Sequence, residues 1–356
     1  MSRYLIAQIE PHEADWDGIE SCPDCTVFHT RQWDHYLSTI GRNHFILSIS
    51  TITTPTSCIG FFVATIRNFG IKLIGSPDGG SGTYVQGLCM KEEVSADERM
   101  AIYQDIIAFV FENRLASYIQ VSDWSLSSHS TEWIPQPSYT FSFPTTKGFH
   151  QNLRSTLFID TSLPEEQLWA NLKYKSCKYC INKARKLGLH IKVVDRREEI
   201  PEFVDTLSAL IQDVSRRKHE RRHVHHSKKY LMALCQSLFP NRVLMLQVLG
   251  TTDNGTEQVM ASSVFCIGPS VSTYFSGASN EEYMKYCPNE LMIWEGMRIL
   301  HNHGSRDLIL GGIASYKKKY GSSYSFLPMM VFSRYRILDN MRTSLKRIYK
   351  AIRQKK

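Results

Sequence analysis

The sequence lacks the hydrophobic segments that a membrane span or a secretory leader requires. No run of about 18 apolar residues occurs, which is the length needed to cross a bilayer. The N-terminal stretch MSRYLIAQIEPHEADWD has no apolar core of the kind that a signal peptide carries. We therefore expect a cytoplasmic protein.

The cysteines do not form the dense pattern of a disulfide framework. There are nine, an odd number scattered along the chain, which indicates reduced thiols. Two pairs have C-x-x-C spacing, Cys22 with Cys25 and Cys177 with Cys180. Roughly 150 residues separate the pairs, against the ~15 to 20 of a zinc ribbon, and the second pair is lysine-rich. We expect no metal site, and whether the pairs meet in space stays open.

The composition is that of a folded protein with local positive charge. Hydrophobic residues make up 42% and charged residues 21% of 356 residues, which excludes disorder and suggests two domains. The net charge of +8 is concentrated in three segments, residues 173–186, 216–229 and 342–356. This distribution favours local contacts with anions over general coating of nucleic acid.

The same order of elements is predicted twice along the chain. The first half reads as strands at 45–52 and 59–66, a Gly-rich loop at 76–82, a strand near Tyr84, a helix at 96–113 and a strand at 116–121. The second half reads as strands at 243–249 and 259–267 around a hairpin turn, a strand at 272–276, a helix at 289–303 and a strand at 307–310. A recurring hairpin, strand, helix and strand indicates one α/β unit used twice.

A linker rich in Pro, Thr and Gly at 141–153 separates the halves. We therefore expect an N-terminal domain at 1–152 and a C-terminal domain at 153–327, with residues 328–356 packing on the first. The last segment contains an amphipathic basic helix with a stripe from Met341 to Ile352. Peripheral contact with a membrane surface is the alternative role for this helix.

A basic helix opens the second half. Ser162-Leu-Pro-Glu165 matches a capping box, so we expect a helix from there to the cap at Gly188. Between Lys173 and Lys186 there are six Lys or Arg and no acid. Without acidic partners this face repels itself, so an anionic ligand is a reasonable expectation.

Several segments together carry a family resemblance. LWANLKYKSCKYCINKARKLGLHI, YFSGASNEEYMKYCPNELMIWEGMRILHNHG, DLILGGI and YKKKYGSSYSFLP resemble the second half of the Fem-type (FemAB/FemX-like) peptidyltransferases, the last being similar to their FKxxFG signature. In the first half, VFHTRQWDHYL and SPDGGSGTYVQG are similar to the polysaccharide-associated (CelD/BcsL-like) acyltransferases. The resemblance implies two tandem GNAT-like N-acyltransferase domains, each a mixed, mostly antiparallel sheet flanked by helices.

The resemblance also implies a chemistry, in which an amine attacks the carbonyl of an activated acyl group. The donor is an acyl-coenzyme A or an aminoacyl-tRNA, bound as a co-substrate with no tightly held cofactor. The acceptor is an amine of a small molecule or of a cell-envelope, polysaccharide or peptide precursor. Such a reaction needs mainly orientation, a donor for the oxyanion and removal of the amine proton. The acceptor's identity and the oligomeric state stay open.

The candidate site residues follow from this resemblance. Lys317 matches the signature lysine and is expected to contact the donor's phosphate or carbonyl, with a surface lysine as the alternative. Tyr316 and Tyr320 replace the signature phenylalanines and line the site or pack beneath it. Asp123, expected near the acceptor, orients or deprotonates the amine, unless it is a turn or cap residue.

Donor phosphates are expected at the start of the helix that begins at Pro288 and Asn289. The usual Gly-rich phosphate loop is missing, so Lys178, Arg185 and Arg217 are expected to take part in phosphate binding. Lys178 stands where many relatives carry arginine. The long coiled-coil arm of some tRNA-dependent relatives is absent.

Two other functions compete with this interpretation. His219-Glu220-Arg221-Arg222-His223 spells the HExxH motif of zinc hydrolases, with two histidines on one helix face and a glutamate as base. The arginines between them would oppose a divalent ion, so we interpret the segment as a basic patch facing an anion. A catalytically silent RNA-binding protein is the third possibility.

Overall fold

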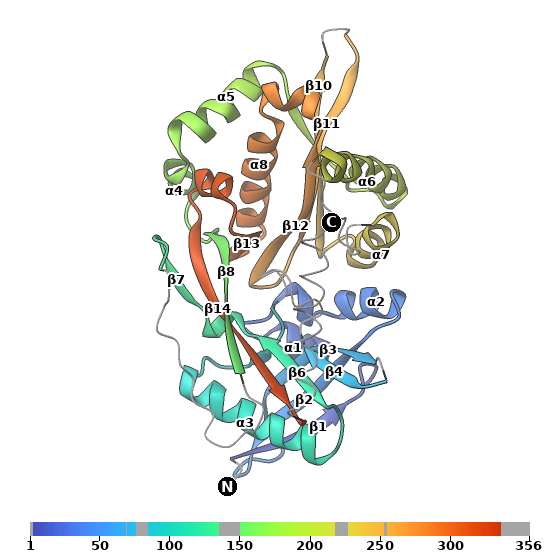
Figure 1. The fold of residues 1–356 in the computed structure, drawn as a ribbon, viewed down its shortest axis with the longest axis vertical. Coiled ribbons are helices and arrows are strands. Elements are labelled where there is room, and N and C mark those ends of the chain that lie inside the picture. Colours follow the sequence, from blue (N-terminus) through green and yellow to red (C-terminus); the bar gives the residue numbers. More distant parts are fainter. Residues whose placement is uncertain are drawn as a thin grey trace, which may run out of the picture.

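The computed structural model describes residues 3–68, 70–75, 85–134, 150–217, 227–252 and 255–335. Its strands form one 14-stranded sheet in the order β1-β2-β3-β4-β6-β14-β8-β13-β12-β11-β10-β9, with β5 paired to β3 and β7 to β14 (Figure 1). The strands are β1 Tyr4–Ile9, β2 Asn43–Thr51, β3 Cys58–Asn68, β4 Lys72–Gly75, β5 Leu88–Met90, β6 Tyr118–Ser122, β7 Ser128–Ser130, β8 His150–Asp160, β9 His190–Val193, β10 Val243–Thr251, β11 Glu257–Cys266, β12 Val271–Ser279, β13 Asp307–Gly312 and β14 Ser323–Ser333.

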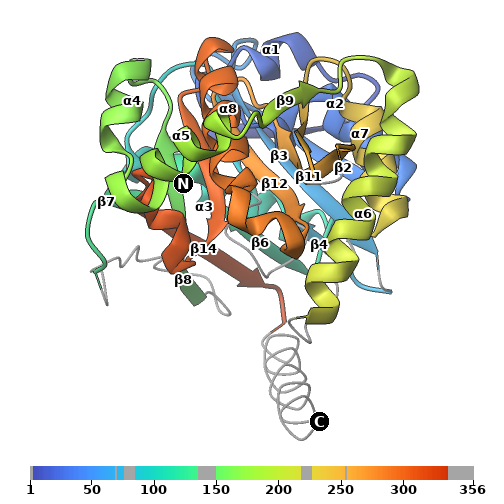
Figure 2. The same cartoon turned by 90° about the horizontal axis from the view of Figure 1, so that it is seen from above.

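Helices cover both faces of this sheet (Figure 2). The α-helices are α1 Trp16–Glu20, α2 Arg31–Thr39, α3 Ala96–Glu112, α4 Glu165–Asn171, α5 Tyr179–Lys186, α6 Ile200–Arg217, α7 Lys228–Leu238 and α8 Pro288–Asn302. The shorter helical turns are η1 Val27–His29, η2 Trp124–Leu126, η3 Tyr174–Lys178, η4 Arg197–Glu199, η6 Glu281–Tyr286 and η7 Ser315–Tyr320. Among the described helices, none combines the length and hydropathy that crossing a bilayer requires.

The predicted repeat is confirmed by the strand pairing. In the first half β2 and β3 form an antiparallel pair, β4 pairs with β3, and β6 returns after α3 to lie parallel to β4. In the second half β10, β11 and β12 are successive antiparallel neighbours, and β13 returns after α8 parallel to β12. The mixed, mostly antiparallel α/β fold expected from the sequence is therefore present.

Two strands join the halves at the centre of the sheet. β8 pairs with β13 of the second half, and β14 pairs with β6 of the first half. β8 and β14 also pair with each other along most of their length, from Ser323 with Phe158 to Val331 with His150. The boundary expected at residue 152 lies inside β8 and the one at 328 lies inside β14, so the division into domains stays a prediction.

The basic helix differs from the expectation in two ways. Pro164 is the N-cap residue of α4, and no side chain caps this N-terminus, so the predicted capping box is wrong. The Ser162 hydroxyl instead donates to the Asp160 carboxylate. The helix also breaks at Leu172, whose backbone is extended, and resumes as the single π-turn η3 before α5. Leu168 and Leu172 are both buried in the core that α8 also lines.

Some predicted features fall outside the described residues. These are the Gly-rich loop at 76–82, the strand position at Tyr84, the linker up to residue 149, the HExxH segment at 219–223 and the C-terminal helix. The linker residues 150–153 belong to β8.

Candidate active site

The two parallel strands of the second half part before they end. β12 and β13 pair only from Val271 with Asp307 to Thr273 with Ile309. β12 then runs on to Ser279 and β13 to Gly312 without further pairing to each other. α8 follows the end of β12, and η7 follows the end of β13. Backbone groups that have left a ladder need other partners, so such a divergence can receive an extended ligand.

Lys317 lies on η7 at the end of β13. Its ammonium donates to the carbonyl oxygens of Leu310 at 2.6 Å and Gly312 at 3.4 Å. Leu310 is the residue left unpaired at the register shift between Ile309 and Gly311 in the pairing of β13 with β8. An ammonium has three N–H groups, so one remains without a partner among the described residues. Burial lowers the pKa of Lys317 to about 8, which places its titration near neutrality.

Three contacts fix η7 in place. The ammonium of Lys319 pairs with the carboxylate of Glu290 in the first turn of α8. The backbone N–H of Lys173 donates to the carbonyl of Lys319 at 3.0 Å. Gly321 ends η7 with a φ of +74°, and a β-carbon there would lie 2.8 Å from that of Asn171. Only glycine combines that conformation with that approach, which explains the glycine of YKKKYG.

The two signature tyrosines have different environments. Tyr320 is buried at 2% exposure under the ammonium of Lys319, whereas Tyr316 is 57% exposed. The Lys317 ammonium lies 5.9 Å from the Tyr316 ring. Tyr320 therefore packs beneath the site, and Tyr316 stands at its surface beside Lys317.

Arg217 and Asn289 converge on the last residue of β12. The Asn289 side-chain amide donates to the Ser279 hydroxyl at 2.9 Å, and Arg217 reaches the Ser279 carbonyl at 3.5 Å. Arg217 also forms ion pairs with Asp213 and Glu281, both at 3.2 Å. Its charge is therefore compensated in this state, and a donor phosphate would have to compete with two carboxylates.

Arg185 and Lys178 lie on the other side of α8. Arg185 pairs with Glu295 at 2.8 Å and lies over the Trp169 ring. The Lys178 ammonium donates to the Ala170 carbonyl at 2.9 Å. The expected phosphate ligands thus do not form a single cluster, and their phosphate-binding roles stay predictions.

We call the segment from Lys173 to Lys186 the η3–α5 surface. Its tyrosines Tyr174 and Tyr179 are 74% and 59% exposed. Lys175, Lys183 and Lys186 have no ion-pair partner within the described part of the chain. Exposed aromatic rings beside uncompensated cations are typical of surfaces that bind single-stranded nucleic acid.

Asp123 lies in the first half and its carboxylate is fully engaged. One oxygen accepts from Arg99 at 3.1 Å and from the Tyr103 hydroxyl at 2.8 Å, and the other accepts from the Ser125 N–H at 3.0 Å. Arg99 also pairs with the buried carboxylate of Asp24. These contacts, and an exposed fraction of 4% for Asp123, are typical of a carboxylate with a structural role. A catalytic role for Asp123 stays a prediction.

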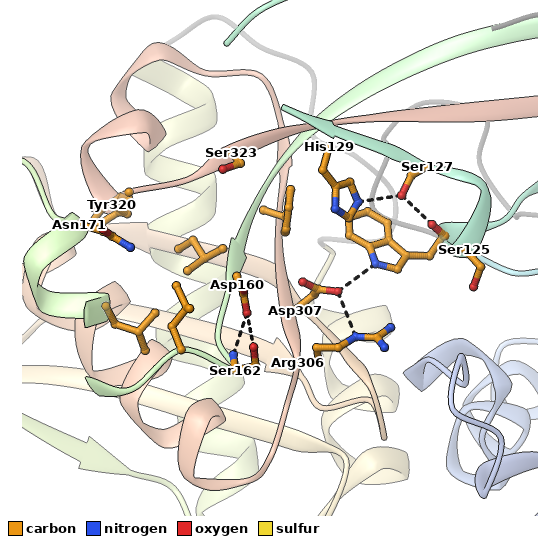
Figure 3. Close-up of a pocket in the computed structure, with 16 residues that line it drawn as sticks. Ser125, Ser127, His129, Asp160, Ser162, Asn171, Arg306, Asp307, Tyr320 and Ser323 are labelled. Atoms are coloured by element: carbon orange, nitrogen blue, oxygen red, sulfur yellow. Dashed lines mark hydrogen bonds and ion pairs between the residues drawn. The ribbon is translucent and has the colours of Figure 1, made fainter. Parts of the chain in front are cut away.

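A pocket of about 530 Å³ lies beside η7 and is lined from both halves (Figure 3). The Asp307 carboxylate accepts from the Trp124 indole N–H at 3.1 Å, and His129 lies 2.8 Å from the Ser127 hydroxyl. Burial raises the pKa of Asp307 and lowers that of His129. The remaining polar lining includes Asp160, Arg306 and Tyr320.

Sequence reasoning missed this pocket because its walls come from segments far apart in the chain. Trp124 follows β6, Phe158 lies on β8 and Asp307 opens β13. The available signal was a polar residue at the start of a strand that is otherwise apolar, the Asp307 of DLIL. Tyr320 connects the pocket to the helical turn that carries Lys317.

Comparison with known proteins supports this architecture. Residues 173–319 match the family model described as an acetyltransferase (GNAT) domain. The crystal structure of FemX is similar at a TM-score of 0.65 and 12% identity, covering 91% of this chain and 96% of that one. A search of curated protein sequences found no match.

Two further structures are similar at lower TM-scores. The first is the C-terminal domain of a putative lysylphosphatidylglycerol synthetase from Agrobacterium fabrum, with a TM-score of 0.44 and 9% identity, covering 80% of this chain and 85% of that one. The second is a glucosamine N-acetyltransferase region of a fungal multi-domain β-N-acetylglucosaminidase, with a TM-score of 0.38 and 11% identity, covering 92% of this chain and 38% of that one. The domain match confirms the expected resemblance to GNAT acyltransferases over residues 173–319, and the chain shares its fold with FemX. The GNAT match also supports N-acyltransferase activity in general.

Proposed function

We propose that the protein is an N-acyltransferase that moves an acyl or aminoacyl group from an acyl-coenzyme A or an aminoacyl-tRNA to an amine. The observation that carries this proposal is the position of Lys317. Its ammonium lies on the Leu310 and Gly312 carbonyls, where β13 has parted from β12, and keeps one N–H available. A partly buried cation at that point suits a carbonyl whose oxygen becomes negative.

In the proposed reaction the acceptor nitrogen attacks the donor carbonyl and forms the amide C–N bond. The C–S bond of a thioester, or the C–O bond of an aminoacyl ester, breaks. The attacking amine loses a proton, and the leaving thiolate or ribose oxygen gains one. Lys317 donates its free N–H to the oxyanion between these events, while its two carbonyl contacts hold the ammonium in position.

Of the two donors, the η3–α5 surface favours an aminoacyl-tRNA. Lys175, Lys183 and Lys186 would contact phosphates, and Tyr174 and Tyr179 would stack on unpaired bases of the tRNA end. The α8 N-terminus offers one backbone donor fewer than most helix starts, because Pro288 in its first turn has no N–H. This makes it a weaker site for a coenzyme A pyrophosphate.

We place the acceptor in the pocket of Trp124, Asp160 and Asp307. Its carboxylates suit a cationic group of the acceptor other than the attacking amine, and the Trp124 ring offers an apolar wall. Asp307 lies three residues before Leu310 on β13, so the pocket floor and the Lys317 contact are roughly 10 Å apart at 3.3 Å per residue. An amine on a flexible arm spans that distance, which suits an amine-bearing cell-envelope, polysaccharide or peptide precursor.

The test is a titration of the protein with acetyl-coenzyme A and with a nonhydrolysable aminoacyl-tRNA mimic, followed by calorimetry. We expect micromolar binding of the tRNA mimic, weakened by Lys183→Ala combined with Tyr179→Ala and unaffected by Lys229→Ala outside the surface. Binding of coenzyme A alone would reassign the donor, and binding of neither would refute the transferase.

A further inference from the structure

Three metal-binding side chains from separate segments meet in the core of the first half. Cys25 follows α1, His29 lies on η1 and Cys89 lies on β5. Both sulfur atoms and a ring nitrogen of His29 lie within 4.8 Å of one another. The exposed fractions are 0% for both cysteines and 3% for the histidine. None of these side chains belongs to the site proposed above.

We propose that Cys25, His29 and Cys89, completed by Cys22, form a structural zinc site. Cys22 and Cys25 are the ends of the turn Cys-Pro-Asp-Cys, closed by a hydrogen bond from the Cys25 N–H to the Cys22 carbonyl at 3.0 Å. Two residues between cysteines is the spacing with which one turn supplies two thiolates to zinc. Cys22 is 2% exposed and lies in the same core cluster as Cys25 and Cys89.

The distances suit a tetrahedral ion after a small contraction. Zinc lies about 2.3 Å from sulfur and about 2.0 Å from nitrogen, so its ligand atoms are roughly 3.5 to 3.8 Å apart. The thiols of Cys25 and Cys89 are already hydrogen-bonded to each other. Cys22 now donates to the Gly18 carbonyl at 3.4 Å, and rotation of its side chain would exchange this long bond for the metal.

His29 loses little by coordination. Two backbone N–H groups face its ring, that of Thr26 at 3.0 Å from Nδ1 and that of Gly87 at 3.2 Å from Nε2. A neutral imidazole has one lone pair, so it accepts from only one of them, and a metal displaces at most one hydrogen bond. With zinc on Nε2, the backbone N–H groups of Gly87 and Thr26 would have to turn away from the ring, and the Nδ1–H would donate to the Thr26 hydroxyl, 3.2 Å away, in the manner of ligating histidines.

Such an ion would tie the loop after α1 to β5 and to η1. η1 contributes Val27 and Phe28 to the core shared with α6 and α7 of the second half. Asp24, between the two cysteines of the turn, already accepts from the Met90 N–H at 3.0 Å beside Cys89. The zinc would therefore brace the contact between the halves, without contacting substrate.

The test is zinc content per chain, measured by inductively coupled plasma mass spectrometry on full-length protein after dialysis. We expect about one zinc in the wild type and a loss of at least about half in Cys25→Ser and in Cys89→Ser. Cys58→Ser is the matched control, since Cys58 packs against the same cluster but is not a proposed ligand. His223→Ala separates this site from the HExxH segment and should leave zinc unchanged.

Cobalt substitution keeps the proposal testable even if a serine variant fails to fold. Wild-type protein reconstituted with Co²⁺ should show the near-ultraviolet thiolate charge-transfer band of a multi-cysteine site. Absence of zinc and of that band in the wild type would overturn the proposal. Zinc that is lost with His223→Ala but kept in Cys25→Ser and Cys89→Ser would overturn it equally.

Discussion

Replacing Lys317 by methionine tests the proposed oxyanion contact. Two of the three ammonium N–H groups donate to the carbonyl oxygens of Leu310 and Gly312, and the third can donate to the carbonyl of the acyl donor. Removal of one hydrogen-bond donor to the oxyanion of an acyl-transfer site lowers kcat about 10²- to 10³-fold, or by about 2.7 to 4 kcal/mol. Because the contact strengthens only in the transition state, kcat and kcat/KM should fall together while donor binding is kept.

The pH dependence follows from the lowered pKa of Lys317. With its pKa at about 8, the ammonium loses its charge as the pH rises through that value, so wild-type kcat should fall above about pH 8. Arginine does not titrate in this range. Lys317→Arg should therefore retain part of the activity without this alkaline decrease.

Stability is the control for this prediction. A lysine whose folded pKa lies below its unfolded value binds fewer protons when folded, so its contribution to stability rises with pH between about 8 and the ordinary value. Methionine removes a charge that folding disfavours and also the hydrogen bonds to Leu310 and Gly312, so these effects oppose each other and the melting temperature of Lys317→Met should change little. The Lys318 ammonium contacts the carbonyl oxygens of Thr131 and Ser322, away from Leu310 and Gly312. Lys318→Met should therefore keep its kcat. Full kcat in Lys317→Met, or a rate that increases through pH 8, would refute the reasoning.

Four further substitutions separate the remaining roles. Asp123→Asn breaks a buried ion pair with Arg99 and should cost about 3 to 5 kcal/mol in urea unfolding; an unchanged midpoint with lost kcat would instead indicate catalysis. Lys175→Ala and Lys183→Ala should each weaken tRNA binding and reduce its logarithmic salt slope by about 0.7, while an unchanged slope would remove the η3–α5 surface from donor binding. Asp307→Asn should raise KM for the acceptor about tenfold with little change in donor affinity, and the opposite pattern would exclude the pocket as the acceptor site.

Local patterns predicted the elements of this fold well. β10 and β11 were recognisable from two apolar runs that flank the turn at 251–255, and α3 and α8 from helical patterns. The pairing of β8 with β14 was not predicted, because pairing between residues 158 and 323 leaves no local signal. The break at Leu172 was missed because the residues on both sides of it are helical, in α4 and in α5.

The candidate site was predicted in part. The match to the family signature led to Lys317, and Arg217 and Asn289 do meet at the end of β12. Spacing along the chain could not reveal that Arg185 and Arg217 are paired with Glu295 and Glu281, because those carboxylates come from other elements. The cluster of Cys25, His29 and Cys89 was missed because β5 brings Cys89 from 60 residues beyond His29.

Transfer itself is the measurement that tests the central claim most directly. Aminoacyl-tRNA and acetyl-coenzyme A, each labelled in the acyl group, are incubated separately with the protein and a panel of amine-bearing envelope and peptide precursors. The label is then followed into amide products by mass spectrometry. We predict an amide product that forms with wild-type protein and is formed about 10²- to 10³-fold more slowly by Lys317→Met. No amide from either donor, or equal rates in the two proteins, would contradict the proposal that this site transfers acyl groups to amines.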